Sequence, residues 1–229
     1  MNDIYTKAVT AYCERTSRDG TSEPWNAVSN FAFFIVAFFI YRLFKKQSAL
    51  RRNFWILLFL AVFIGFGSLL WHTIPNPLTH FLDAGPIWLF IAIFVYEIFR
   101  FISKSKKLAL LSILFIAIVQ ISVTIWFPQF LNGSLRHAIN GVIFAVISFL
   151  FIKKYRFVSL NLVSALTSYI VAIYFRTIDN EICSIIPTGS HFLWHIFNSL
   201  AIYFSLKILL ELDKLEKDRS EASLDAQTS

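Results

Sequence analysis

Three histidines in this sequence have the spacing and the setting of a metal site. His191 and His195 are four residues apart, so on a helix both imidazoles share one face and can bind one ion at roughly 2 Å. His72 closes a distant apolar run and supplies a third imidazole. Three histidines with an open fourth position are typical of catalytic zinc, so we predict a zinc site. The alternative is that all three are interfacial side chains of a membrane protein.

Two polar residues beside these histidines could carry the rest of a hydrolytic reaction. Ser68 lies one helical turn before His72, and Asp83 opens the next apolar run. The carboxylate could hold and deprotonate an attacking water, while the hydroxyl could donate to the developing oxyanion. The simpler alternatives are that Ser68 bonds to a backbone carbonyl and that Asp83 caps its helix. His80 and His137 have no partner at ligand spacing, and we expect both to be structural or interfacial.

The composition indicates that a membrane surrounds these residues. The 229 residues are 57% hydrophobic and only 15% charged, which is too apolar for a soluble domain of this size. The net charge of +7 is spread over the connections between apolar runs, which argues against a nucleic-acid partner. Residues 1–24 lack the pattern of a signal peptide, so we expect the first apolar run to be retained.

The chain contains seven apolar runs that are long enough, or nearly so, to cross a bilayer as helices. The runs are continuously apolar, whereas the strands of a membrane barrel alternate between apolar and polar residues. We therefore predict an all-α bundle of seven transmembrane helices, of which the fifth is the shortest. The predicted spans are Trp25–Phe44, Phe54–Trp71, Phe81–Phe99, Leu108–Phe127, Ala138–Ile152, Phe157–Phe175 and His191–Leu210.

Basic residues predict the orientation of the bundle. The connections between spans one and two, three and four, and five and six, with the adjoining span ends, hold twelve Lys and Arg, whereas the other three connections hold only Arg136 and Arg176. Because basic connections face the cytoplasm, the N-terminus should lie outside and the C-terminus inside. His72, Asp83 and His191 then all fall at the outer end, although Lys and Arg alone set the orientation. We expect residues 1–212 to form the membrane domain and the polar residues 213–229 a solvated helix end that runs into disorder.

At these residues the chain resembles the alkaline ceramidase family, in the membrane hydrolase superfamily that includes the adiponectin receptors. The resemblance covers nearly the whole chain and implies that zinc is held by the three histidines, with Asp83 activating water and Ser68 steadying the oxyanion. The implied reaction cleaves the N-acyl bond of a ceramide to a sphingoid base and a fatty acid. The matching segments are Tyr12–Glu14, Glu23–Asn30, Gly65–His72 with Asp83, Ile178–Asn180 with Cys183, and Gly189–His195.

The resemblance also implies two features of the N-terminal segment. Cys13 and Cys183 match cysteines of the family that form a pair, and the predicted orientation places both outside, where oxidation is permitted. Glu14 and Glu23 match family residues that bind calcium. However, Ala11 and Thr16 stand where the family's eukaryotic pattern has an acidic residue and Asn, which removes two side-chain ligands. The alternative to a calcium site is that Glu14 pairs with Arg15 or Arg18 and that Glu23 caps the first helix.

The sequence thus predicts a zinc-dependent intramembrane amidase that acts on ceramide or a similar N-acyl lipid. Its setting would be a bacterial inner membrane or a eukaryotic internal membrane. A lipid esterase or phospholipase of the same superfamily is the nearest alternative, because the same chemistry attacks esters. A zinc-containing receptor is a further alternative, although the short cytoplasmic connections offer little surface for a signalling partner. A transporter is disfavoured because no inverted repeat is visible.

Overall fold

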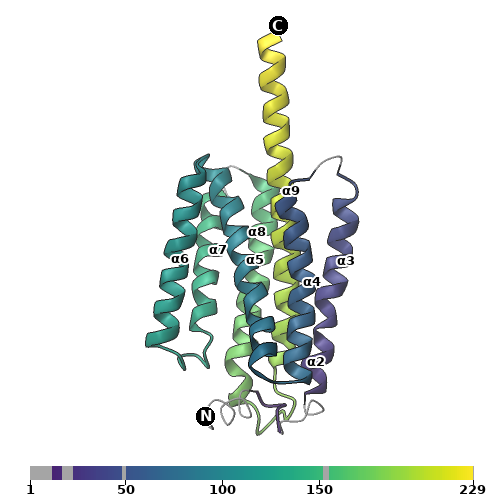
Figure 1. Ribbon diagram of the computed structural model, residues 1–229, viewed down its shortest axis with the longest axis vertical. Helices are drawn as coiled ribbons and strands as arrows, with labels where there is room; N and C mark the ends of the chain where they lie inside the picture. Colours follow the sequence, from purple (N-terminus) through teal and green to yellow (C-terminus); the bar gives the residue numbers. More distant parts are fainter. Residues whose placement is uncertain (1–11, 17–22, 48–49, 152–154, 229) are drawn as a thin grey trace.

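The computed structural model describes residues 12–16, 23–47, 50–151 and 155–228, and within these ranges the chain is helical without a strand. The helices stand side by side as one bundle (Figure 1). A short 3-10 helix, η1 (Asp179–Glu181), precedes the last of them. The α-helices are α2 (Pro24–Ser29), α3 (Phe31–Phe44), α4 (Arg52–Thr73), α5 (Pro77–Ser103), α6 (Lys106–Trp126), α7 (Leu135–Phe151), α8 (Arg156–Ile178) and α9 (His191–Thr228).

The predicted all-α membrane bundle is confirmed. Six spans in the described residues are long and apolar enough to cross a membrane, and α2 and α3 together make the first of them. The weakest predicted span corresponds to α7, an apolar helix of 17 residues. Its predicted end, Ile152, lies outside the described residues. The chain is therefore a multi-pass integral membrane protein.

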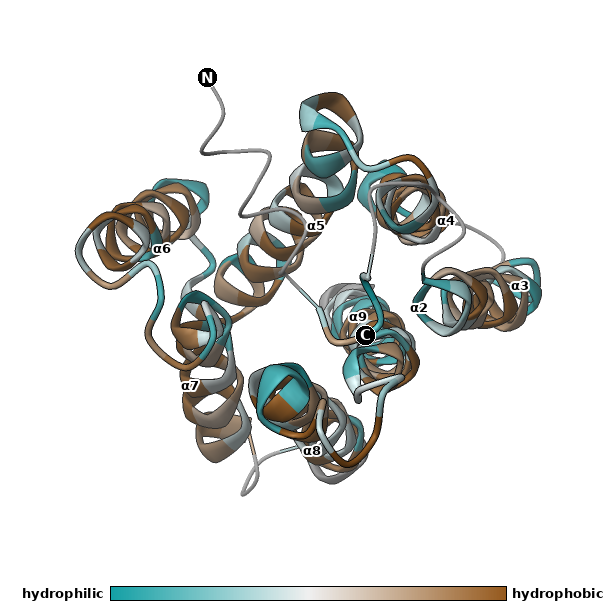
Figure 2. Cartoon of the chain, turned by 90° about the horizontal axis from the view of Figure 1, so that it is seen from below, coloured by the Kyte–Doolittle hydropathy of each residue, from teal (hydrophilic) through white to brown (hydrophobic). Residues whose placement is uncertain are grey.

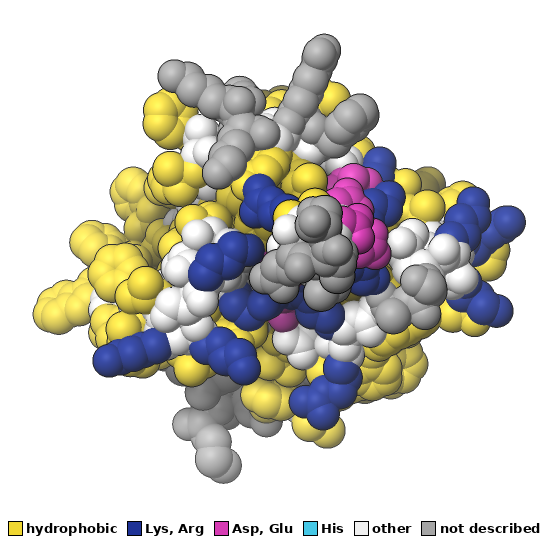
Figure 3. Space-filling model, turned by 90° about the horizontal axis from the view of Figure 1, so that it is seen from above, with side chains coloured by type: hydrophobic (Ala, Val, Ile, Leu, Met, Phe, Trp, Pro, Cys, Tyr) yellow, Lys and Arg dark blue, Asp and Glu magenta, His cyan; other side chains and the backbone are white. Residues whose placement is uncertain are grey.

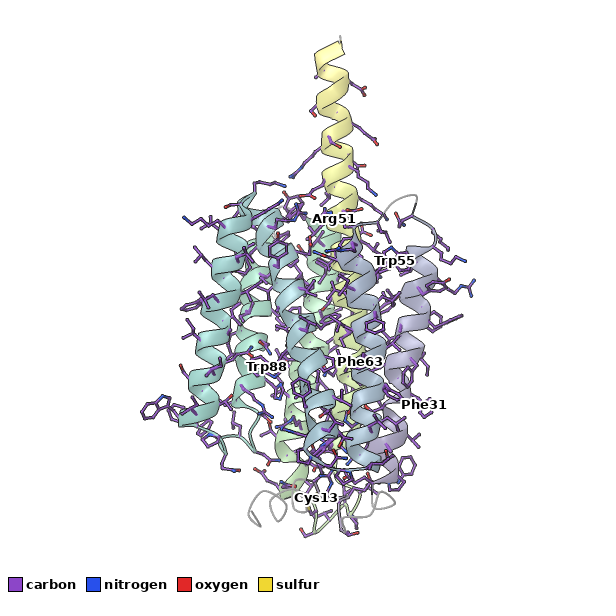
Figure 4. All side chains as sticks on the ribbon, in the orientation of Figure 1. Cys13, Phe31, Arg51, Trp55, Phe63 and Trp88 are labelled. Carbon is purple, nitrogen blue, oxygen red and sulfur yellow. A yellow bond between two sulfur atoms is a disulfide. The ribbon has the colours of Figure 1, made fainter. Side chains whose placement is uncertain are left out.

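Helix α9 lies inside the bundle, and the other helices surround it unequally (Figure 2). It packs against α8 most extensively and also contacts α2, α3, α4 and α5. Helix α6 lies at the rim, where it contacts α5 and α7. Large apolar side chains on the outer surface, such as Phe31 and Trp55, are 53% and 42% exposed (Figure 4). Apolar groups at such positions suit contact with lipid, since a bilayer solvates them without a hydrophobic penalty.

One end of the bundle, which we call the basic end, carries Lys and Arg side chains around the emerging α9 (Figure 3). Arg51 donates there to Asp213 across 3.1 Å and also pairs with Glu216. These ion pairs attach α9 to α4 beyond Leu210, where we expected the span to end. The structure describes helix as far as Thr228, in the region where the sequence predicted a tail that loses its order. The boundary at residue 212 and the side of the membrane that this end faces stay predictions.

The opposite end, which we call the site end, is where α9 begins (Figure 1). Helices α4 and α5 approach each other very closely there, because a Cβ atom added to Gly67 would lie 2.0 Å from the carbonyl oxygen of Leu82. Glycine permits such backbone contact between membrane helices. The contact brings the residue after Gly67, which is Ser68, next to the residue after Leu82, which is Asp83.

Candidate active site

The three predicted zinc ligands meet at the site end of the bundle. His72 closes α4, while His191 and His195 lie in the first two turns of α9. One nitrogen from each ring lies within 4.8 Å of the others, and the three residues are 1%, 3% and 2% exposed. Tetrahedral ligands at about 2 Å from one ion would lie about 3.3 Å apart. The three rings therefore need to close by small rotations to share an ion.

The hydrogen bonds of the three rings fit a metal site. His72 Nδ1 lies 2.7 Å from Glu23 Oε2, and His195 Nδ1 lies 2.7 Å from Ser29 Oγ. Such partners on one ring nitrogen orient a metal-binding histidine and leave Nε2 for the ion. His191 Nδ1 is buried and has no hydrogen-bond partner in the described part of the chain. A buried nitrogen without a partner is costly in a protein interior, and a bound cation would satisfy it.

Ser68 and Asp83 adjoin this cluster. Ser68 Oγ lies 3.5 Å from His195 Nε2, and its hydroxyl also interacts with the Asp83 carboxyl group. Asp83 in turn interacts electrostatically with His72. The structure thus brings a hydroxyl, a carboxyl and three imidazoles from α4, α5 and α9 to one place.

A cavity opens beside these groups. His80 and His137, which we expected to be structural or interfacial, line it and also contact the rings of Trp71 and Trp194. Two arginines whose role the sequence did not indicate line it too. The polar side chains around the cavity are Tyr12, His80, Asp83, Arg136, His137, Arg176, His191 and His195.

The start of α9 is fixed by a carboxylate and by a disulfide. Asp179 Oδ1 accepts hydrogen bonds from the backbone N–H groups of Ser190 and His191, at 2.7 and 2.9 Å. Its other oxygen accepts from the backbone N–H of Cys13 at 3.0 Å. Cys13 is bonded to Cys183, with an S–S distance of 2.01 Å. Asp179 belongs to a segment that the family resemblance includes, but its position in the connection before the last span did not reveal that it binds the backbone of a predicted metal ligand.

The two glutamates of the N-terminal segment exchange the roles that the sequence alternative gave them. Glu23, rather than Glu14, pairs with Arg15. Glu14, rather than Glu23, caps α2, because its carboxylate accepts from the backbone N–H groups of Trp25 and Asn26, at 2.8 Å each. Ala11 and Arg18, which entered the sequence argument, lie outside the described residues. Buried acids at this end thus have protein partners, including a guanidinium.

Charge and burial act differently on these two carboxyl groups. Burial raises the pKa of Glu14 above its usual value. Burial also acts to raise the pKa of Glu23, but the hydrogen bond and charge of His72 together with the charge of Arg15 hold that pKa below its usual value. All four carboxylate oxygens of the pair accept hydrogen bonds from described donors. A calcium ion takes six to eight oxygen ligands, and residues 17–22 between the two glutamates lie outside the described residues, so the calcium site stays a prediction.

Comparison with known proteins agrees with this geometry. No curated protein matches the sequence. The family model described as Ceramidase matches residues 5–227, a range that includes all three histidines, Ser68 and Asp83. The chain therefore belongs to the ceramidase family, and it is a membrane hydrolase that acts on the amide bond of ceramide.

Proposed function

We propose that the chain is a zinc-dependent intramembrane amidase that cleaves the N-acyl bond of ceramide or a similar N-acyl lipid. His72, His191 and His195 hold the ion in this proposal, Asp83 is the general base and Ser68 is the oxyanion donor. The observation that carries it is the convergence of three buried imidazoles, with a hydroxyl and a carboxyl group beside them, at one cavity of a ceramidase-family chain.

The protein groups divide the reaction between them. A zinc ion with three imidazole ligands polarises a carbonyl and makes a water more acidic. Asp83 accepts a proton from the attacking water and later gives it to the nitrogen of the leaving amine. Ser68 donates a hydrogen bond to the oxygen of the attacked carbonyl as negative charge develops on it. One water is consumed, the C–N bond breaks, and a fatty acid and an amine are released.

Apolar side chains continue inward from the polar cavity. A second cavity, lined mainly by apolar side chains of α5, α7, α8 and α9, lies deeper in the bundle than the polar one. Ile87 of α5 lines both cavities, which indicates that they adjoin. An acyl chain in the deeper cavity would place its amide carbonyl near the histidines. This arrangement suits a substrate that enters from the bilayer.

Metal analysis combined with lipid hydrolysis tests the proposal. The purified protein should contain about one zinc per chain, and His72→Ala, His191→Ala and His195→Ala should each lose both the metal and the hydrolysis of ceramide. Asp83→Asn should keep the metal and lose at least about a hundred-fold in kcat, because a general base contributes roughly 10²–10⁴-fold. Activity that persists in protein stripped of zinc would reject the proposal.

Two controls test whether the metal loss is specific to the three ligands and whether the activity is specific to amides. His137→Ala removes an imidazole that lines the same cavity but lies outside the ligand cluster, so this variant should retain its zinc. A panel of N-acyl and O-acyl lipids with the same chains separates amidase from esterase activity. Predominant release of fatty acid from phospholipids would favour the esterase alternative.

A further inference from the structure

The site end of the bundle has an unusual pair of positive charges. Its three connections between predicted spans hold only Arg136 and Arg176 as basic residues, against twelve Lys and Arg in or directly beside the connections of the other end. The two arginines are forty positions apart and belong to different helices, α7 and α8. Both nevertheless line the cavity beside His191 and His195. We call them the arginine pair.

Arg176 is held in place by neutral groups. Its Nη1 donates to the backbone oxygen of Asn132 at 2.8 Å and to Ser134 Oγ at 2.7 Å. Its guanidinium also lies 5.9 Å from the ring centroid of Trp194. No ion pair joins Arg176 to a carboxylate in the described part of the chain. These contacts orient the guanidinium but do not neutralise its charge.

Arg136 lies in the first turn of α7 and, like Arg176, has only neutral contacts among the described residues. Its Nε lies 3.4 Å from His137 Nε2, and no described carboxylate forms an ion pair with it. Both guanidiniums of the arginine pair line one cavity, where their like charges oppose each other. Asp83 lies within electrostatic reach of Arg176, but it is a single carboxylate opposite two guanidiniums, and the proposed reaction uses it for proton transfer.

Two like charges that line one cavity of the bundle need a compensating partner. Ionisable groups inside a membrane protein are expensive and mark substrate sites by default. The planar guanidinium fork matches the oxygens of carboxylates and phosphates, and such charge-assisted bonds are about twice as strong as neutral ones. An acyl lipid offers such oxygens in an anionic headgroup or in the carboxylate that amide cleavage releases.

We propose that the arginine pair is a subsite for an oxyanion carried by the lipid, so that N-acyl lipids with an anionic headgroup are cleaved in preference to neutral ceramide. This inference rests on the proposed amidase function and names the class of substrate for it. The lipid places its acyl chain in the apolar cavity, its amide at the histidines and its anionic group against Arg136 and Arg176. The subsite also accepts the carboxylate of the released fatty acid as the second source of the same chemistry.

A matched pair of substrates tests the headgroup. Zinc-loaded protein in detergent is assayed with ceramide and with ceramide 1-phosphate of identical chains. Wild type should show a kcat/KM at least about ten-fold higher for the phosphorylated lipid, since one charged hydrogen bond contributes about 1.5–3 kcal/mol, and 1.4 kcal/mol is ten-fold. Arg136→Gln should lower kcat/KM for ceramide 1-phosphate about ten-fold more than it lowers kcat/KM for ceramide. Arg52→Gln makes the same charge change on an exposed residue of the basic end and should keep the wild-type ratio.

Arg176 needs a second variant, because its loss removes the bonds to Asn132 and Ser134 and so changes packing as well as charge. Arg176→Lys keeps a positive charge without the planar fork. It should reduce the preference for ceramide 1-phosphate while thermal unfolding stays near that of wild type. If a folded Arg176→Lys protein keeps the wild-type ratio of kcat/KM for ceramide 1-phosphate to kcat/KM for ceramide, the planar guanidinium of Arg176 does not bind the oxyanion.

Palmitate binding to zinc-free protein separates the two sources of the oxyanion. If wild type does not prefer ceramide 1-phosphate but Arg136→Gln weakens palmitate binding about ten-fold, the subsite serves the released carboxylate. If neither the substrate ratio nor palmitate binding responds to Arg136, the subsite proposal is overturned while ceramide hydrolysis stands. If no lipid is hydrolysed but palmitate binding still depends on Arg136, the amidase proposal fails and the subsite remains.

Discussion

Glu23→Gln tests whether a carboxylate outside the ligand cluster sets the affinity for zinc. Glu23 is 1% exposed and lies between two buried partners, His72 Nδ1 at 2.7 Å and the Arg15 guanidinium. A glutamine of nearly the same size fills the space but carries no charge. Its amide can accept from only one of these donors with its single oxygen, while its own N–H groups face the other. We therefore expect the His72 ring to be held less firmly in its orientation and to bind zinc more weakly.

Glu23→Gln should lower two quantities, the affinity for zinc and the free energy of unfolding. Loss of a carboxylate that orients a metal-binding histidine costs about ten- to a hundred-fold in metal affinity, which is about 1.4–2.7 kcal/mol. Removing the carboxylate from beside the buried guanidinium of Arg15 costs about 3–5 kcal/mol in the free energy of unfolding. The first quantity is measured by competition for zinc with a chelator of known affinity. The second is measured by unfolding of the metal-free protein in detergent.

Two further variants separate these effects. Glu14→Gln changes a carboxylate that caps α2 and contacts none of the three histidines, so it should cost about 0.5–2 kcal/mol of stability and leave zinc affinity within about two-fold. The double variant Arg15→Gln, Glu23→Gln removes both charges of this ion pair and should regain stability without regaining zinc affinity. If Glu23→Gln alone binds zinc as tightly as wild type, Glu23 does not position His72 and the reasoning is refuted.

Three other perturbations follow from the same structure. Chelation of calcium by EGTA should leave ceramide hydrolysis within about two-fold, because Arg15 already supplies a cation to the acidic segment, and strong stimulation by added calcium would contradict this. Reduction of the disulfide, or replacement of both Cys13 and Cys183 by Ser, should lower the free energy of unfolding by about 2–5 kcal/mol. The reason is that the bond closes a loop across 170 positions. An unchanged Tm under reductant would contradict this prediction. Gly67→Ala should cost about 1–3 kcal/mol and reduce hydrolysis, because the new Cβ would lie 2.0 Å from a carbonyl oxygen of α5, as read by Tm and kcat. Gly85→Ala is its matched control, since the nearest atoms lie 3.7 Å away, and equal losses in both variants would refute the packing argument.

The bundle could be predicted because a bilayer makes span assignment a local problem. Each crossing helix must satisfy its own backbone hydrogen bonds and present about twenty apolar residues, and both properties can be read from neighbouring residues. The end of α9 is the exception. Its polar continuation has no apolar face, and the ion pairs of Asp213 and Glu216 with Arg51 depend on a residue of a different helix.

The histidine site was also accessible from the sequence, but its surroundings were not. The spacing of His191 and His195 puts both on one helix face whatever the tertiary structure is. The partner of each carboxylate depends instead on packing between segments. Glu14 and Glu23 have the same chemistry, and their neighbours along the chain, Arg15 after Glu14 and Pro24 after Glu23, indicated the opposite of the partners that the structure shows.

Composition, run length and i, i+4 spacing act within one segment, so they were enough to predict the membrane setting, the helical class and the residue types able to hold a metal. Which distant groups meet depends on how the helices pack. Backbone contact at Gly67 brings Ser68 to Asp83, and the α7 and α8 helices bring Arg136 and Arg176 to one cavity. Such meetings depend on the relative placement of helices, which is set by the packing of many side chains together and leaves no signal at any single position.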